Sequence, residues 1–167
     1  NPLFVYGGSG LGKTHLVAAL AHQARAANPD LRVEFTSGEE VAEHLQRVIA
    51  SGQAQLFIEH YQQIDLLILD DVQFLTGHIM QGTGRQLVLT SDRQPSEIPD
   101  VDQRLLSRLI GGLVVDVGAP DYEMRLAILR NVAGVQGVEF GDGVLNEVAR
   151  LAFGNVRELK GALNKLS

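Results

Sequence analysis

A glycine-rich segment close to the start of the chain has the residue types and spacing of a phosphate-binding loop. Residues 7–14 read GGSGLGKT, which matches the pattern G-x-x-x-x-G-K-[ST]. Glycines allow backbone N–H groups to turn inward and approach phosphate oxygens closely. The lysine of this pattern reaches the β and γ phosphates, and the final hydroxyl ligates magnesium. The segment therefore predicts binding of ATP and Mg²⁺ by Gly7, Gly8, Ser9, Gly10, Leu11, Gly12, Lys13 and Thr14.

Two adjacent carboxylates follow an apolar run in the middle of the chain, where residues 66–71 read LLILDD. Ligands of open α/β sheets bind at the carboxyl ends of the strands, which is where this pair falls. Asp70 is expected to hold magnesium through water, and Asp71 to orient or deprotonate the attacking water. Strands also end in Asp at ordinary turns, so the motif is informative only together with residues 7–14. The combination favours a nucleotide-hydrolysing site.

The elements that would position these residues alternate between strands and helices. Short apolar runs predict strands at residues 3–6, 32–36, 66–69, 86–90 and 114–117. Helical patterns fall at residues 13–27, 39–50, 53–61, 101–108, 144–151 and 156–166, with a further helix from Pro120. The alternation predicts an α/β fold in which a parallel five-stranded sheet lies between helices. We expect a P-loop nucleotide-binding subdomain at residues 1–118 and part of a small C-terminal helical lid at residues 119–167.

Finer features of three helices can also be predicted. In the first helix Leu16, Leu20 and Ala24 recur at intervals of four and predict one face. Pro120 and Asp121 have the residue types of a helix start. The last helix is expected to begin after Asn155, with Glu158 completing a capping box.

The connection after the third predicted strand does not fit a parallel sheet. Parallel neighbours need a crossover of about a dozen residues or more, usually with a helix. Residues 76–84 read TGHIMQGTG, which is too rich in glycine and threonine for a helix of useful length. We infer that a helical segment near His78 and Ile79 is missing from this sequence, either left out of it or deleted.

Composition restricts the class of protein further. The chain has 167 residues, 45% of them hydrophobic, which is enough for a domain with its own core. It contains no apolar run of 18 residues or more, and no cysteine, so thiolate metal sites are excluded. Both facts agree with a cytoplasmic location. The net charge of −6 argues against a free-standing duplex-DNA binder.

With these motifs in view, the chain resembles the AAA+ module (domain III) of the bacterial replication initiators of the DnaA family. Residues 1–16 resemble that family's Walker A region, and residues 65–74 (DLLILDDVQF) its Walker B. Residues 89–93 (LTSDR) are similar to its sensor 1 strand, and residues 104–108 (RLLSR) to its arginine-finger segment, box VII. Residues 155–164 resemble its sensor 2 helix. The likeness covers nearly the whole chain in the same order.

The resemblance implies roles for four further residues. His15 would belong to the nucleotide-binding segment. Asp92 would contact the water that attacks the γ-phosphate, or the Walker B pair, although an ordinary turn is the local alternative. Arg157 would face a phosphate from the first turn of its helix, where the dipole disfavours a cation, although a solvated arginine is the plain alternative. Arg108 would act as the finger that one subunit inserts toward the ATP of its neighbour, or else is a plain surface arginine.

The resemblance also implies partners. We expect self-association through the ATP site, with the arginine finger acting in trans, and a slow ATPase that depends on this assembly. Origin DNA would be engaged mainly through regions that these 167 residues lack, among them the helix-turn-helix domain expected beyond Ser167. His78 alone remains where the family has basic residues that contact single-stranded DNA. The replicative helicase is a further candidate partner.

Two other classes of function stay open at this point. A DnaA-related regulator or helicase loader would share the ATPase core without a DNA-binding tail. A nucleotide-gated interaction protein would bind ATP without significant hydrolysis. The complete reading frame separates the first of these from an initiator, and hydrolysis measurements separate the second.

Overall fold

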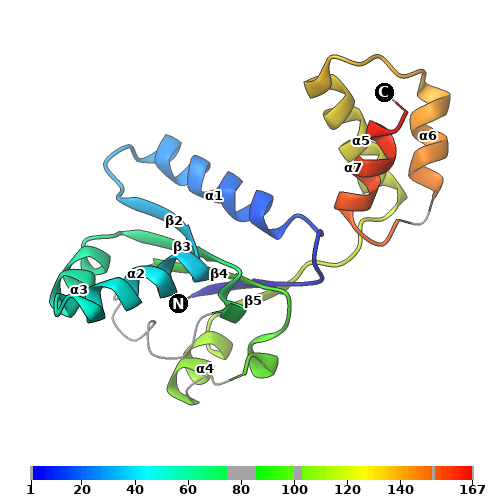
Figure 1. The fold of residues 1–167 in the computed structure, drawn as a ribbon. Helices are drawn as coiled ribbons and strands as arrows, with labels where there is room; N and C mark the ends of the chain where they lie inside the picture. Colours follow the sequence, from blue (N-terminus) through cyan, green and yellow to red (C-terminus); the bar gives the residue numbers. More distant parts are fainter. Residues whose placement is uncertain (1, 75–85, 100–102, 152, 167) are drawn as a thin grey trace. The chain divides into compact units, whose positions relative to one another are not determined.

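The computed structural model describes residues 2–74, 86–99, 103–151 and 153–166 (Figure 1). They form two compact units. The first unit contains Asn1–Gly7 and Lys13–Asp116, and the second contains Gly8–Gly12 and Val117–Ser167. The expectation about His78 and Ile79 lies outside the described residues. The functional division at residue 118 stays a prediction.

A parallel sheet of five strands forms the centre of the first unit. The strands are β1 (Leu3–Tyr6), β2 (Val33–Ser37), β3 (Leu66–Asp70), β4 (Gln86–Ser91) and β5 (Leu113–Asp116), in the spatial order β2-β3-β4-β1-β5. Every strand pairs with its neighbours in parallel, so the carboxyl ends of all five lie at one edge. The predicted α/β fold class is confirmed.

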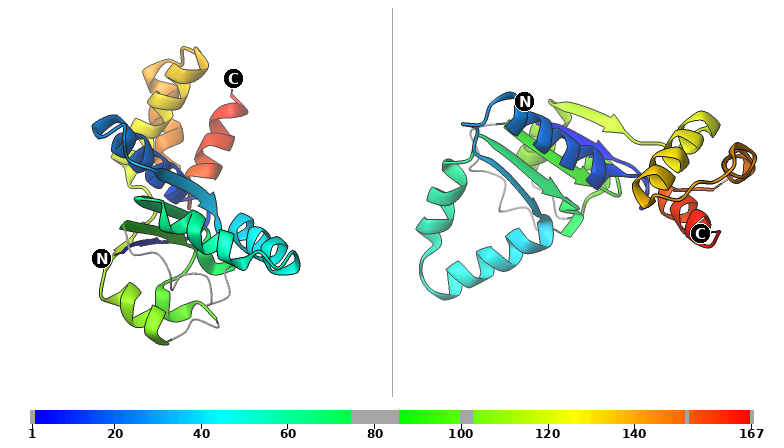
Figure 2. Two further views of the ribbon diagram at one scale, coloured as in Figure 1. Left: turned by 90° about the vertical axis from the view of Figure 1, so that its left-hand side faces the viewer. Right: turned by 90° about the horizontal axis from the view of Figure 1, so that it is seen from above.

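Helices cover both faces of this sheet (Figures 1 and 2). One face carries α2 (Gly38–Ala50), α3 (Ala54–Gln62) and α4 (Gln103–Ile110), whose apolar side chains share a buried cluster with alternate strand residues. The other face carries α1 (Lys13–Ala27). Phe4 and Leu89 belong to the cluster, so the residues that follow them in sequence point toward the α1 side. Thr90 and Asp70 thereby face α1.

The buried face of α1 matches the predicted one only in part, because Leu20 and Ala24 are partly buried but other residues form its centre. Val17 and Ala21 are buried, whereas Leu16 is 51% exposed. Both sets of residues repeat every four positions, so spacing alone does not choose between them. Lys13, on the same line as Val17, is buried as well and lies at the sheet edge, and this contact fixes the rotation of the helix.

The start of α2 is held by a reciprocal pair of hydrogen bonds. The Ser37 hydroxyl accepts from the Glu40 N–H at 3.1 Å, and the Glu40 carboxylate accepts from the Ser37 N–H at 2.9 Å. This capping box joins the end of β2 directly to the helix. The break between α2 and α3 comes at Gly52, whose φ of 70° lies in the left-handed region that favours glycine.

The second unit is a helical bundle with its own core. It contains α5 (Tyr122–Gln136), α6 (Asp142–Arg150) and α7 (Val156–Asn164) around a separate apolar cluster. The Arg125 guanidinium donates to the carbonyls of Ala149 and Pro120, both at 2.7 Å, and so ties the start of α5 to the end of α6. No helix in either unit, within the residues described, is long and apolar enough to cross a membrane.

The predicted caps of this unit are found with one change. Asp121 is the N-cap of α5, and its carboxylate accepts from the Met124 N–H. Asn155 caps α7 by accepting from the Glu158 N–H at 2.9 Å. The Glu158 carboxylate reaches the Gly154 N–H at 3.3 Å, one residue before the position that a standard capping box uses.

Candidate active site

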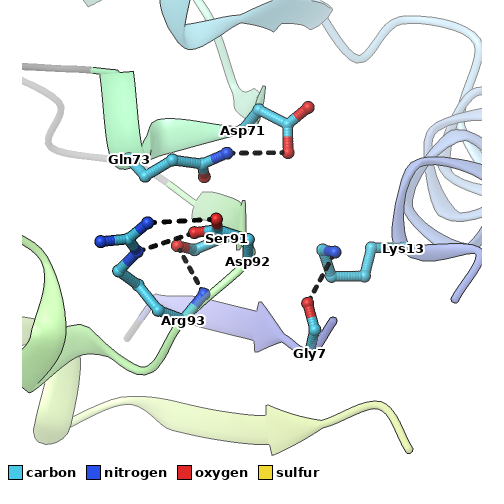
Figure 3. A network of polar contacts seen from close by, with 7 residues as sticks. All are labelled: Gly7, Lys13, Asp71, Gln73, Ser91, Asp92 and Arg93. Carbon is cyan, nitrogen blue, oxygen red and sulfur yellow. Dashed lines mark hydrogen bonds and ion pairs between the residues drawn. The ribbon is translucent and has the colours of Figure 1, made fainter. Parts of the chain in front are cut away.

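Lys13 lies at the junction between the carboxyl end of β1 and the start of α1. Its ammonium group donates to the Gly7 carbonyl at 2.8 Å, and the side chain is only 7% exposed (Figure 3). A buried ammonium group is costly unless polar groups surround it. The loop therefore holds a positive charge at the edge of the sheet where the strands end.

Two glycines of the loop between Gly7 and Lys13 have conformations that other residues rarely adopt. Gly10 has a φ of 78° and Gly12 a φ of 97°. The Gly10 carbonyl accepts a hydrogen bond from the Val156 N–H at 3.0 Å, within the second unit. A Cβ at Gly10 would lie 3.0 Å from the Asn155 Oδ1 atom and 3.3 Å from the Arg157 Cβ atom. Glycine is thus required at position 10 both by φ and by the closeness of α7.

Thr14 and Asp70, which are 56 positions apart in the sequence, are in direct contact. The Thr14 hydroxyl donates to the Asp70 Oδ2 atom at 2.7 Å. The sequence-predicted magnesium ligands are therefore neighbours. A hydroxyl and a carboxylate are oxygen donors of the kind that Mg²⁺ prefers, and Mg²⁺ usually takes few protein ligands beside phosphates and water. No cluster of three or more His, Asp or Glu side chains suited to a metal occurs among the described residues. Because Thr14 and Asp70 place two oxygen donors side by side, the residues present fit a magnesium ion.

Asp71 has a constrained backbone. Its φ of 55° makes it the one non-glycine residue with a positive φ in the described part of the chain. Its N–H donates to the Thr90 hydroxyl at 2.9 Å. Its carboxylate accepts from the Gln73 side-chain amide at 3.3 Å, as Figure 3 shows. These contacts fix the direction in which the carboxylate leaves the end of β3.

Asp92 immediately follows β4, the strand next to β3 in the sheet. Its carboxylate accepts from the Arg93 guanidinium at 2.9 Å (Figure 3). This hydrogen bond lowers the pKa of Asp92 below its ordinary value. Partial burial acts in the opposite direction, and the charges of Arg93 and Lys13 lower the pKa further. Asp92 is therefore an anion held near the lysine, in the region where the sequence predicts the attacking water.

The remaining predicted residues are His15, Arg108 and Arg157. His15 lies exposed in the first turn of α1. Arg108 is an exposed residue in the last turn of α4, on the sheet face opposite α1. Arg157 is exposed in the first turn of α7, in the second unit. The nucleotide-binding role of His15 and the catalytic roles of Arg108 and Arg157 stay predictions.

One residue of the site was missed by sequence reasoning. Thr90 is fully buried on β4, and its hydroxyl donates to Asp70 while accepting from the Asp71 N–H. Its polarity directly after a buried apolar run, residues 87–89, was an available signal. The pairing of the strands, which only the fold reveals, gives this signal its meaning.

The features described so far define a P-loop NTPase of the AAA+ class. They are a phosphate-binding loop, a Walker B strand, a parallel sheet of order β2-β3-β4-β1-β5, and a separate helical unit that follows in the sequence. The family model of the bacterial DnaA ATPase domain matches residues 1–116. The chain therefore belongs to the bacterial DnaA family, in the part that forms its ATPase domain.

Solved structures agree with this assignment. Domain III of the Thermotoga maritima replication initiation protein DnaA has a TM-score of 0.90 and 38% identity, over 99% of this chain and 75% of that one. A replication initiator DnaA bound to AMPPCP and single-stranded DNA has a TM-score of 0.84 and 32% identity, over 99% of this chain and 55% of that one. This chain thus spans about half of the longer initiator. The Thermotoga maritima RuvB Holliday junction branch migration motor, with 16% identity and a TM-score of 0.68 over 99% of this chain and 54% of that one, shares the fold.

Proposed function

We propose that this chain is the ATP-binding and hydrolysing AAA+ module of a replication initiator, which forms ATP-dependent oligomers that engage and open origin DNA. The observation that carries the proposal is the contact of 2.7 Å between the Thr14 hydroxyl and the Asp70 carboxylate. It joins the end of the phosphate-binding loop to the end of the Walker B strand, as nucleotide hydrolysis requires. The cytoplasm is the expected location.

The described residues divide the work of hydrolysis among them. Lys13 holds the β and γ phosphates, while Thr14 and Asp70 hold magnesium. The ion held by these two residues would supply positive charge that offsets the charge developing on the phosphate oxygens. Asp71 orients the attacking water and accepts its proton as the new P–O bond forms and the bond to the β-phosphate oxygen breaks. Asp92 stays anionic beside this water.

Completion of the site in a neighbouring subunit explains the position of Arg108. This arginine lies in the last turn of α4, a helix that packs on the sheet face opposite α1. A trans arginine supplies positive charge to the transition state. We propose that assembly brings Arg108 to the ATP of the next subunit, so that turnover is slow before assembly. Arg157 supplies a second positive charge from α7.

DNA engagement is proposed by analogy with the DnaA structure that contains single-stranded DNA and AMPPCP. The net charge of −6 disfavours strong binding of duplex DNA by the isolated chain. We propose that origin DNA is held mainly by other parts of the initiator, and that ATP-dependent assembly of this module aligns them. The replicative helicase is a further proposed partner.

Single-turnover hydrolysis tests the enzymatic part of the proposal. Asp71→Asn keeps the size of the side chain and tolerates the left-handed backbone, but it removes the proton acceptor. We expect the rate to fall by roughly 100-fold or more, with ATP affinity nearly unchanged. Asp30→Asn, a change of the same kind in the exposed turn after α1, serves as the control and should behave as the wild type. Equal rates in the wild type and Asp71→Asn would instead favour a nucleotide-gated binding protein.

A further inference from the structure

One buried hydroxyl contacts both carboxylate residues at the end of β3. Thr90, on the neighbouring strand β4, is 0% exposed. The register pairs Leu69 with Leu89, so Asp70 and Thr90 are the next positions along the two strands. Thr90 donates its proton to the Asp70 Oδ1 atom and accepts the Asp71 N–H at 2.9 Å. We propose that Thr90 is a positioning residue, which sets the orientation of the metal-binding carboxylate and of the catalytic one.

The contacts leave Asp70 little freedom. Its Oδ1 atom accepts from Thr90, and its Oδ2 atom accepts from Thr14 at 2.7 Å. Each oxygen keeps lone pairs for a metal or its water shell, because a carboxylate has about four acceptor positions. The two hydroxyls come from different elements, β4 and α1, and together they fix the plane of the carboxylate. Loss of either hydroxyl allows the group to rotate.

The same hydroxyl acts on Asp71 through the backbone. A positive φ is uncommon for residues other than glycine, and this conformation persists only where surrounding contacts favour it. The hydrogen bond from the Asp71 N–H to Thr90 is such a contact, formed at the residue where the chain leaves β3. Thr90 therefore couples the orientation of Asp70 to that of Asp71. A change in the orientation of one of these residues is therefore transmitted to the other.

This inference rests on the proposed function, and its test separates the two. Three substitutions are compared with the wild type. Thr90→Val keeps the shape and removes the hydroxyl, whereas Thr90→Ser keeps the hydroxyl. Thr36→Val is the matched control, because the Thr36 hydroxyl also donates to a carboxylate, but to that of Glu40 at 2.8 Å and not to a predicted site residue.

The first readout is the magnesium concentration needed for tight binding of a fluorescent ATP analogue. The second is the affinity of the protein for this analogue in EDTA. The third is kcat and KM for ATP hydrolysis by the assembled protein. Removal of an outer-shell partner of a metal ligand typically costs about 10–100-fold in metal affinity or activity. We expect Thr90→Val to raise the magnesium requirement and lower kcat by factors in that range, with the affinity in EDTA and the KM for ATP nearly unchanged. Thr90→Ser should restore both quantities, and Thr36→Val should match the wild type.

A purely structural role for Thr90 would lower the melting temperature without altering the magnesium requirement. That result, or a Thr90→Ser variant as impaired as Thr90→Val, would overturn the inference while leaving the proposed function intact. Should Thr90→Val fail to fold, Thr90→Ala takes its place with the same expectations. Absence of magnesium-dependent ATP binding by the wild type would overturn both the inference and the proposed function.

Discussion

At the scale of single residues, the phosphate-binding loop requires glycine at position 10 for two reasons. Gly10 has a φ of 78°, and its missing Cβ would meet the Asn155 side chain at 3.0 Å. Asn155 cannot turn aside without loss, because its side-chain oxygen caps α7 through the Glu158 N–H. A side chain at position 10 would therefore meet both backbone strain and a fixed neighbour.

A double-mutant cycle separates these two causes. Gly10→Ala should destabilise the protein by about 1–3 kcal/mol from the strained backbone alone, and further through the contact. In an Asn155→Ala background the contact is removed, so the added cost of Gly10→Ala should be smaller by about 0.5 kcal/mol or more. Free energies of unfolding from urea titrations of the four proteins provide the test. Additive effects would show that the closeness of Asn155 does not contribute.

The residues of the site differ in how well the sequence predicted them. Lys13, Thr14 and Asp70 come from motifs whose spacing encodes their chemistry, and the fold brings these three residues together. Thr90 was not predicted, because its importance comes from the register between β3 and β4. A threonine that follows an apolar run gives no indication, from the sequence alone, of its cross-strand neighbour.

At the scale of elements, strands were easier to predict than the rotation of helices. The strand β3 is buried at every position, so its apolar run was unambiguous. In α1 two lines of residues with the same spacing competed, and the side of Val17 became buried because Lys13 belongs to that line. Tertiary contacts at one end of a helix therefore decided which face is buried, and local periodicity could not include them.

The packing of α3 beneath the sheet predicts a dependence of stability on alkaline pH. Burial raises the pKa of Tyr61 to about 12, with the charges of Glu34 and Glu40 adding to it, from an ordinary value of 10.0. The neutral phenol is therefore favoured in the folded state, and its contribution to stability is complete below pH 10. This contribution is lost as the pH rises from about 10 toward 12, because the unfolded chain releases the proton first.

Removal of the ionisable group tests this prediction. In Tyr61→Phe the free energy of unfolding should fall less between pH 9 and pH 11.5 than in the wild type, as measured by urea titration at each pH. Tyr122→Phe, in α5 of the second unit, controls for the general effect of losing a phenol. A decline as steep in Tyr61→Phe as in the wild type would assign the alkaline loss to other groups.

At the scale of the whole molecule, the chain combines an α/β unit that holds Lys13, Asp70 and Arg108 with a helical unit that holds Arg157. The α/β class and the helical nature of the second unit follow from the alternation of patterns along the sequence. Assembly could not be predicted from composition, because an arginine finger and a surface arginine look identical within one subunit. The role of Arg108 therefore has to be tested in oligomers.

Arg108→Ala should separate assembly from nucleotide binding. The affinity for ATP should stay within about twofold of the wild type, because the arginine completes the site of a neighbour. ATP-dependent oligomers, detected by light scattering after size-exclusion chromatography, should be lost. Arg130→Ala, an equal change of charge on the exposed side of α5, serves as the control. Normal assembly by Arg108→Ala would remove the finger assignment.

The most direct test of the account is the binding of ATP and Mg²⁺ to the wild type and to Lys13→Ala, measured by titration calorimetry. Hydrogen bonds to charged groups contribute up to about 3 kcal/mol, which corresponds to roughly a 100-fold change in affinity. We expect Lys13→Ala to lose at least this much, while Lys165→Ala, an equal change just after α7, binds as the wild type does. Retained affinity in a folded Lys13→Ala protein would contradict the assignment of residues 7–14 as the nucleotide site.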